Sequence, residues 1–315
     1  MSTIASKAIV KISIPVFVLL LIILTISCVE NEPAKKVSLM KGTNEEHSSV
    51  KYPQHKALWF GFDLRLGPKE EVLIYTPFLN YLEKSTGRRF RIKFTEKYED
   101  TISNLGKGIT HFAAVGSLSY VLGHEKYGIK YLVSSVNSEG DATYHSIIFT
   151  RPDSLIKDVH ELKQKCFAFG SRMSTQGHII PRFMLEEAGI TLDDLEKYSY
   201  TGSHLNAVKS VLNGECDAGG IQDTLAKRLA EEGKIKILMM SQPYPSSLIA
   251  YNSSLDEEVV KAVRAALLAF EPSGRHKSIL HEWSKTEMPL GFTKMDEIEF
   301  KRITDLAKKY DLLLK

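Results

Sequence analysis

Short apolar runs alternate with helical patterns through most of this chain, and this alternation restricts its possible folds more than any other feature. Three runs are apolar enough to form buried strands: 57–62, 90–94 and 112–115. Between them, residues 70–85 and 99–105 carry apolar side chains at helical spacing, and glycine closes each stretch. Strands that alternate with helices form βαβ units, so the pattern predicts an α/β fold with mostly parallel sheets.

A pattern of four residues occurs twice in the chain, and this internal echo suggests that the chain contains two similar halves. Four positions recur with the same spacing: Tyr98, Ile102, Leu105 and Gly108 as His204, Val208, Val211 and Gly214. In each set a ring-bearing residue opens an amphipathic helix, a glycine closes it, and a strand of small residues follows. Helices closed by glycine are common, so coincidence is the alternative. As a repeat, the echo predicts two similar α/β lobes.

Two segments are predicted to cross between these lobes, one near 144–151 and the other near 237–249. Helical patterns follow at 256–270 and 296–314. Lobes that are joined by two crossing strands enclose a cleft with a hinge. We assign the chain as follows: signal peptide 1–27, tether 28–56, first lobe 57–145, second lobe 146–240, and return to the first lobe with C-terminal helices 241–315.

The N-terminal segment is typical of an export signal. Lys7 and Lys11 precede an apolar run at 12–26, which is shorter than the ~20 residues of a membrane span. The run ends in Leu24-Thr25-Ile26-Ser27-Cys28, which resembles a bacterial lipobox except that Thr25 stands where leucine is usual. We expect cleavage before Cys28, lipidation of Cys28, and a location in the periplasm or on the outer face of a bacterial membrane. An uncleaved membrane anchor is the alternative.

Charge and cysteine content exclude several classes of function. The net charge is +3, and without Lys7 and Lys11 the chain has 39 basic against 38 acidic residues, which does not favour nucleic-acid binding. The histidines are isolated, so we expect no metal site and no cofactor. Cys166 and Cys216 both open predicted buried strands. Two core thiols are the favoured interpretation, and a disulfide between them remains open.

The segment with the clearest chemical character follows the buried strand 167–170. A polar turn at 171–177 contains Ser174 and Thr175, and a helical pattern follows at 178–188. The first turn of a helix has unpaired N–H groups and a partial positive charge, and hydroxyls at its entry add further donors. The turn therefore predicts an anion site. The alternative is an ordinary helix cap formed by Ser174.

Several short motifs together resemble the phosphonate-binding family of ABC-transporter substrate-binding proteins, over residues 57 to about 270. They are Phe169-Gly170, Ser174-Thr175-Gln176-Gly177, Pro181-Arg182, Gly189-Ile190, Tyr75-Thr76-Pro77-Phe78-Leu79, Tyr81-Leu82-Glu83-Lys84, Gly116-Ser117-Leu118-Ser119-Tyr120, Tyr144-His145-Ser146, Gly202-Ser203-His204 and Gly214-Glu215-Cys216-Asp217-Ala218. The resemblance implies a two-lobed type II periplasmic-binding architecture, which agrees with the echo.

The resemblance also implies which residues contact a phosphorus oxyanion. The family's contacts fall on Ser174, Thr175, His204, Tyr98 and Tyr144. We add Gln176, Gly177, Ser117 and Asp223 as candidate ligand-binding residues. A cage of hydroxyls, an imidazole and backbone N–H groups suits the oxygens of a tetrahedral anion without requiring lysine. For His204, Tyr98 and Tyr144 the alternative is a capping or packing role.

This sequence departs from the family pattern at positions that bear on the ligand. Gln176 stands where the family commonly has serine, and it either donates from its amide or narrows the pocket. Thr224 and Ser247 occupy the positions where aminophosphonate binders have carboxylates, which leaves Asp223 as the nearby acid. The departures do not favour an aminoalkyl phosphonate. They leave phosphate, phosphite and small alkyl phosphonates open.

The function implied is that of the extracytoplasmic solute-binding component of an ABC importer, not an enzyme. We expect a lipid-anchored monomer that binds a small phosphorus oxyanion and meets a membrane permease. A second hypothesis replaces the permease with a membrane sensor kinase. A third makes Cys216 or Cys166 a nucleophile with His204 as base, although both cysteines lie at strand starts and clefts form at strand carboxyl ends.

Overall fold

The computed structural model describes residues 57–63, 68–95 and 97–313, without the side chains of Pro68, Tyr98 and Glu99. The predicted signal peptide, tether and lipidation site Cys28 lie outside the described residues. Within those residues, the longest apolar helices fall short of what is needed to span a membrane.

The first of two large sheets has six strands in the order β13-β4-β12-β3-β1-β2. Its strands are β1 (Leu58–Asp63), β2 (Phe90–Thr95), β3 (Phe112–Val115), β4 (Lys130–Ser135), β12 (Leu248–Tyr251) and β13 (Phe292–Thr293). The helices of this lobe are α2 (Pro68–Thr86), α3 (Tyr98–Gly106), α4 (Ser117–Tyr127) and α8 (Glu257–Leu268). These bounds confirm the strands and helices predicted from the apolar runs.

The second sheet has five strands in the order β10-β6-β9-β7-β8. They are β6 (Ser146–Thr150), β7 (Cys166–Phe169), β8 (Lys197–Tyr200), β9 (Ala218–Gln222) and β10 (Lys236–Met240). The helical elements are the π-helical turn η2 (Thr175–Ile179), α5 (Ile180–Glu187), α6 (His204–Leu212) and α7 (Asp223–Glu231). Short 3₁₀ turns lie at Val159–Leu162, Leu192–Asp194, Lys277–Ile279, Trp283–Lys285 and Glu297–Phe300.

The internal echo is a structural repeat. Strand β1 pairs in parallel with β2 and β3, and β7 pairs in parallel with β8 and β9, so each lobe has the same three-strand core. Helices α3 and α6 occupy equivalent places before β3 and β9. Gly108 and Gly214 have φ of +72° and +76°, which only glycine adopts readily after a helix.

Both sheets have the predicted parallel core, and each is mixed because antiparallel strands join that core. In each sheet most strands point the same way, and the antiparallel pairs arise where a crossing strand is inserted. Strand β6 pairs antiparallel with β9 and β10, and β12 pairs antiparallel with β3 and β4. The edge strand β13 also runs against β4. The crossing strands enter each sheet from the other lobe, which reverses their direction.

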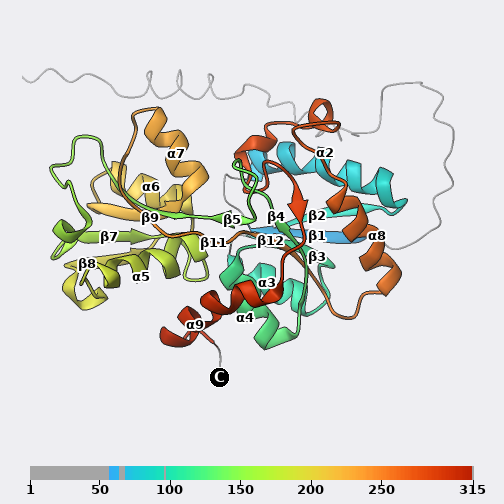
Figure 1. Cartoon of the computed structure of the whole chain (residues 1–315), viewed down its shortest axis with the longest axis horizontal. Helices are drawn as coiled ribbons and strands as arrows, with labels where there is room; N and C mark the ends of the chain where they lie inside the picture. Colours follow the sequence, from blue (N-terminus) through green and yellow to red (C-terminus); the bar gives the residue numbers. More distant parts are fainter. Residues whose placement is uncertain (1–56, 64–67, 96, 314–315) are drawn as a thin grey trace, which may run out of the picture. The chain divides into compact units, whose positions relative to one another are not determined.

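Two short strands and the C-terminal helix connect the lobes. Strands β5 (Thr143–Tyr144) and β11 (Tyr244–Pro245) pair antiparallel with Tyr144 opposite Tyr244, and Figure 1 shows them between the two sheets. Helix α9 (Lys301–Lys309) packs on α4 of the first lobe. At its end, the Lys309 ammonium lies 2.6 Å from a carboxylate oxygen of Glu186 on α5 of the second lobe. The paired strands are the predicted hinge.

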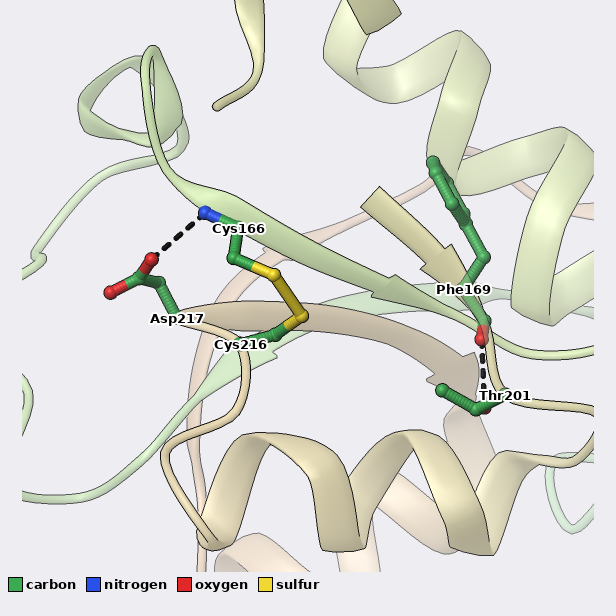
Figure 2. Close-up of a disulfide and its surroundings, with 5 residues drawn as sticks. All are labelled: Cys166, Phe169, Thr201, Cys216 and Asp217. Carbon is green, nitrogen blue, oxygen red and sulfur yellow. Dashed lines mark hydrogen bonds between the residues drawn. A yellow bond between two sulfur atoms is a disulfide. The ribbon is translucent and has the colours of Figure 1, made fainter. Parts of the chain in front are cut away.

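Cys166 and Cys216 form a disulfide, so the favoured prediction of two core thiols is wrong. The pairing of β7 with β9 places Phe167 opposite Ala218 and brings the two cysteines together across a sequence separation of 50 residues. The Cys166 N–H donates to the Asp217 carboxylate at 2.8 Å beside the bridge. Figure 2 shows the disulfide at the start of β7, with Phe169 at the opposite end of the strand.

Candidate ligand-binding site

The site lies where the carboxyl ends of strands lead into helix starts. Gly116 joins β3 to α4, the turn 170–174 joins β7 to η2, and Ser203 caps α6 after β8. Each helix start offers backbone N–H groups and the positive end of a helix dipole. Clefts of α/β proteins form at such strand ends, because the helices diverge there. The topology thus supplies donors for an anion without a lysine or arginine.

The Ser174 turn is a capped helix entry. The Ser174 hydroxyl accepts a hydrogen bond from the Gly177 N–H at 2.9 Å, and the Gly170 N–H donates to the Gly177 carbonyl at 2.7 Å. Ser174 is therefore a helix cap. The hydroxyl retains its own hydrogen, which it can donate in a second direction. Pro181 lies where η2 continues into α5, and the preceding carbonyls of Gln176 and Gly177 accept instead from the Ser146 hydroxyl and the Gly170 N–H.

A buried histidine holds the first part of this turn. The His178 Nδ1–H donates to the Arg172 carbonyl at 2.6 Å, and the Tyr200 hydroxyl lies 3.0 Å from His178 Nε2. Burial lowers the pKa of His178 to about 4, so its ring is neutral near pH 7. Because a carbonyl only accepts, Nδ1 carries the proton and Nε2 accepts from Tyr200. The loop geometry therefore depends on a neutral imidazole.

Helix α4 of the first lobe docks on the turn of the second. The Leu118 N–H in its first turn donates to the Thr175 hydroxyl at 2.9 Å. The Ser119 hydroxyl donates to the Met173 carbonyl at 3.3 Å. Both bonds join a residue of one lobe to a residue of the other, so the lobes are closed at this point. Thr175 accepts from α4 and still has a hydroxyl hydrogen to donate.

Tyr144 of the hinge adds a third hydroxyl. It donates to the Ser117 hydroxyl at 3.1 Å, and Ser117 in turn donates to the Pro245 carbonyl at 2.6 Å. Burial raises the pKa of Tyr144 far above its ordinary value, so the phenol remains a protonated donor. This chain of bonds ties the start of α4 to both hinge strands.

These groups surround a cavity of about 10 Å³, which is room for about one water molecule. Its lining residues are Gly116, Tyr144, Met173, Ser174, Thr175, Gln176, His204 and Glu287. Five of the predicted site residues thus meet at one cavity. Gly177 supports Ser174 and Ser117 supports Tyr144 without lining it. Tyr98 opens α3, and its side chain lies outside the described part of the structure.

Asp223 does not reach this cavity, because Gln176 lies between. The Gln176 amide donates to the His145 carbonyl at 2.8 Å and to the Asp223 carboxylate at 3.3 Å. Asp223 also accepts from the His145 and Thr224 N–H groups, and burial raises its pKa. It lines a larger cavity of about 430 Å³ between α7 and the segments 137–139 and 284–289. Gln176 therefore narrows the smaller cavity.

Residues 60–298, well over half of the chain, match the family described as ABC transporter, phosphonate, periplasmic substrate-binding protein. The chain belongs to this family. The phosphate-import protein PhnD of Mycolicibacterium smegmatis is 25% identical over 222 residues, which cover 64% of this chain and 69% of that protein. The phosphonates-binding periplasmic protein of Escherichia coli is 23% identical over 237 residues, which cover 72% and 70%.

Among solved structures, PhnD1 of Prochlorococcus marinus in complex with methylphosphonate is similar in fold, with a TM-score of 0.73 and 18% identity. The similarity covers 81% of this chain and 98% of that one. It confirms the two-lobed type II periplasmic-binding architecture. Members of the family bind small phosphonate or phosphate ligands outside the cytoplasm and work with an ABC transporter.

The structure adds lining residues that the sequence did not predict. Gly116 was visible only as part of a family motif, and Met173 as part of a polar turn. Glu287 lies inside the family match at 60–298 but after residue 270, where the resemblance drawn from the short motifs ended, and its segment has no helical or strand periodicity that would have marked it. Its carboxylate accepts a hydrogen bond from the Ser247 hydroxyl.

The part of this family member that the structure describes also bears on two other chemistries, a metal site and an enzyme with a cysteine nucleophile and a histidine base. No group of three His, Cys, Asp or Glu side chains there is arranged to hold a metal. The sulfurs of Cys166 and Cys216 are joined at the amino ends of β7 and β9, whereas His204 follows the carboxyl end of β8. The proposed thiol nucleophile and its base therefore lie at opposite ends of the sheet.

Proposed function

We propose that this chain captures a small phosphorus oxyanion, a phosphonate, phosphite or phosphate, in the cavity between Gly116 and Ser174. The observation that carries the proposal is that hydroxyls and helix starts from both lobes meet at one closed cavity. A tetrahedral anion presents several acceptor oxygens, which such a set of donors satisfies. We assign ligand contacts to Ser174, Thr175, Tyr144 and His204, with Tyr98 contributing by the family resemblance.

The hydrogen bonds of the cavity fit a donor role for the Ser174 and Thr175 hydroxyls, whereas Tyr144 donates to Ser117 here and turns its hydrogen to the ligand only when that bond breaks. Ser174 accepts from Gly177 and Thr175 accepts from Leu118, so each directs its own hydrogen to a further acceptor. The α4 N–H groups and dipole add to the attraction for an anion. Gln176 closes the side toward Asp223, which limits the substituent on phosphorus to a small one.

Capture and release require the lobes to separate. A cavity of about 10 Å³ holds about one water molecule, so the lobes separate to admit a tetrahedral anion and then close around it less tightly than in this structure. Rotation occurs at the β5–β11 pair, between a lobe at 57–145 with 241–315 and a lobe at 146–240. The closed form then meets an ABC permease, and no catalytic step is involved.

The N-terminal pattern supports an exported monomer that is attached to a membrane by a lipid on Cys28. The basic start, the short apolar run and the lipobox-like 24–28 segment carry this part of the proposal. Mass spectrometry of the protein from bacterial membranes tests it. We expect a diacylglyceryl group on an N-terminal Cys28, and an unmodified Met1 on the membrane-bound protein would contradict the assignment.

Calorimetric titration with phosphate, phosphite, methylphosphonate, aminoethylphosphonate and sulfate tests the ligand class. We expect binding of at least one of the first three with a dissociation constant in the micromolar range or below. Binding of no phosphorus oxyanion would contradict the proposed function.

Thr175→Ala is expected to weaken binding of the preferred ligand by about 1.5 to 3 kcal/mol, the range for a hydrogen bond to a charged group. It also removes the acceptor of the Leu118 N–H and with it one bond between the lobes. Thr175→Ser keeps the hydroxyl and is the matched control, which should remain close to the natural protein. Equal affinities for all three proteins, by calorimetry, would place the anion elsewhere.

Gly116→Ala is expected to weaken binding about tenfold, or ~1.4 kcal/mol. A Cβ there would lie 3.2 Å from the Thr175 hydroxyl oxygen, inside the already small cavity. The backbone at Gly116 has φ of −73° and ψ of 160°, which alanine adopts without strain, so only the added methyl is tested. Gly274→Ala, on the exposed surface, is the control. Unchanged affinity in Gly116→Ala would show that the ligand does not occupy this space.

A further inference from the structure

A carboxylate lies in the cavity that we assign to an anion, which is an arrangement that calls for explanation. Glu287 comes from the segment between the 3₁₀ turn Trp283–Lys285 and β13, and it lines the same cavity as Ser174, Thr175 and His204. None of the described lining residues is a lysine or arginine. The cavity thus combines hydroxyl and N–H donors with one strong acceptor.

The position of Glu287 is fixed by its neighbours on both sides. The Thr286 hydroxyl donates to the Trp283 carbonyl at 2.8 Å and accepts from the Met288 N–H at 3.1 Å. The Trp283 indole N–H donates to the Met288 carbonyl at 2.6 Å. Trp283 packs against Phe78 and Phe270 in the first lobe's core, with ring centroids 5.0 and 5.2 Å away. These contacts fix the backbone that carries Glu287, and the bond from the Ser247 hydroxyl holds its half-buried carboxylate at the cavity.

A fixed carboxylate distinguishes anions by whether they carry a proton. An oxyanion with no hydrogen places negative oxygens against the carboxylate, and the two repel at short range. An oxyanion that keeps one O–H donates it to the carboxylate in a short charge-assisted hydrogen bond. A carboxylate has about four lone-pair positions, so it can accept a ligand O–H beside the bonds that it makes within the protein, one of which comes from Ser247.

We propose that Glu287 is the specificity-determining residue of the site, and that it selects the monoprotonated form of a phosphorus oxyanion over any anion without an ionisable hydrogen, such as sulfate. The inference rests on the proposed function and adds to it the protonation state of the ligand. Phosphoryl groups keep this proton up to a second pKa near neutrality, about 6 for a phosphate monoester, whereas sulfate has lost it.

The alternative donor for Glu287 is the ammonium group of an aminoalkyl phosphonate. The cavity of about 10 Å³ leaves little space for an alkyl chain, and the Gln176 amide closes the route toward Asp223 and the larger cavity. The geometry therefore favours a proton on the oxyanion itself.

Other titratable groups surround Glu287 and must be separated from it in any pH experiment. Tyr144 of β5 and His204 of α6 line the cavity, and Asp223 of α7 lies behind Gln176. Tyr144 stays protonated because burial raises its pKa. His204 and Asp223 are common to the natural protein and to a Glu287→Gln variant, so a difference between the two isolates the carboxylate.

The experiment is calorimetric titration of the full chain with phosphite, phosphate, methylphosphonate and sulfate across neutral pH, in parallel with Glu287→Gln. For the natural protein we expect affinity to fall about tenfold per pH unit above the second pKa of each ligand, so the midpoint follows the ligand. Sulfate should bind at least a hundredfold more weakly. In Glu287→Gln the amide also donates, so the pH dependence should flatten and the discrimination against sulfate should shrink at least tenfold.

Three results would overturn the inference. If the natural protein binds a phosphorus oxyanion with one pH midpoint for every ligand, the proton is on the protein and Glu287 does not select it. If Glu287→Gln changes neither the pH profile nor the sulfate ratio, the proposed function stands without this role. Tight aminoethylphosphonate binding that Glu287→Gln abolishes would assign the carboxylate to an ammonium group. Binding of no phosphorus oxyanion would remove the proposed function as well.

Discussion

Removal of the disulfide, by Cys166→Ala together with Cys216→Ala, should lower the free energy of unfolding by about 4 kcal/mol. The bridge closes a loop with a sequence separation of 50 residues, and chain entropy alone gives about this value for such a loop. Alanine is preferable to serine because both positions are buried and a hydroxyl would need a partner there. Urea denaturation of the two proteins measures the difference.

The same loop contains the Ser174 turn and His204, so the double variant also separates stability from binding. The disulfide lies at the amino end of β7 and the site at the carboxyl end (Figure 2). We therefore expect ligand affinity within about threefold of the natural protein under conditions where both are folded. Natural protein in a reductant is the matched control. A stability loss below about 1 kcal/mol would show that the bridge adds little to this fold.

Lowering the pH from about 6.5 to about 4 should cost about 3 kcal/mol of stability through His178 alone. The pKa of His178 is lowered by burial from 6.5 to about 4, and each pKa unit corresponds to about 1.4 kcal/mol. Between these values the unfolded chain binds a proton that the folded protein does not, so stability falls as pH falls. Below about pH 4 both states are protonated and this contribution stops changing.

Denaturation curves of the natural protein and of His178→Gln across this window test the prediction. The variant should be less stable near pH 7, since it loses the bonds to Arg172 and Tyr200, but it should lack most of the slope. His160→Gln, at an exposed position, should keep the slope. The pKa of the Asp194 carboxylate is lowered to about 2 by hydrogen bonds from Thr191, so its effect lies at lower pH. An equal slope in His178→Gln would show that other groups dominate.

The fold could be predicted from the sequence because its signals are local. The alternation of apolar runs and helical patterns placed β1, β2 and β3 and the helices between them, and the echo of Tyr98 in His204 predicted a repeat that the sheets confirm. The mixed character of the sheets could not be predicted in the same way. It depends on where the crossing strands β6 and β12 insert, and strand pairing is not encoded in either strand alone.

Contacts between distant segments were the hardest to predict. Cys166 and Cys216 meet only because β7 and β9 are neighbours in a particular register, which spacing in the sequence cannot reveal. Glu287 reaches the cavity from a loop with no periodicity. The Ser174 turn, in contrast, combined a strand, a polar turn and a helix in one short stretch, and the physical properties of helix starts were enough to mark it.

The most direct test of the site is a crystal structure of the protein with the phosphorus oxyanion that binds most tightly. We predict the phosphorus between the turn of Ser174 and Thr175 and the start of α4, with ligand oxygens about 2.5–3.2 Å from both hydroxyls. A ligand bound in the larger cavity beside Asp223 and α7, or outside the space between the lobes, would contradict the account.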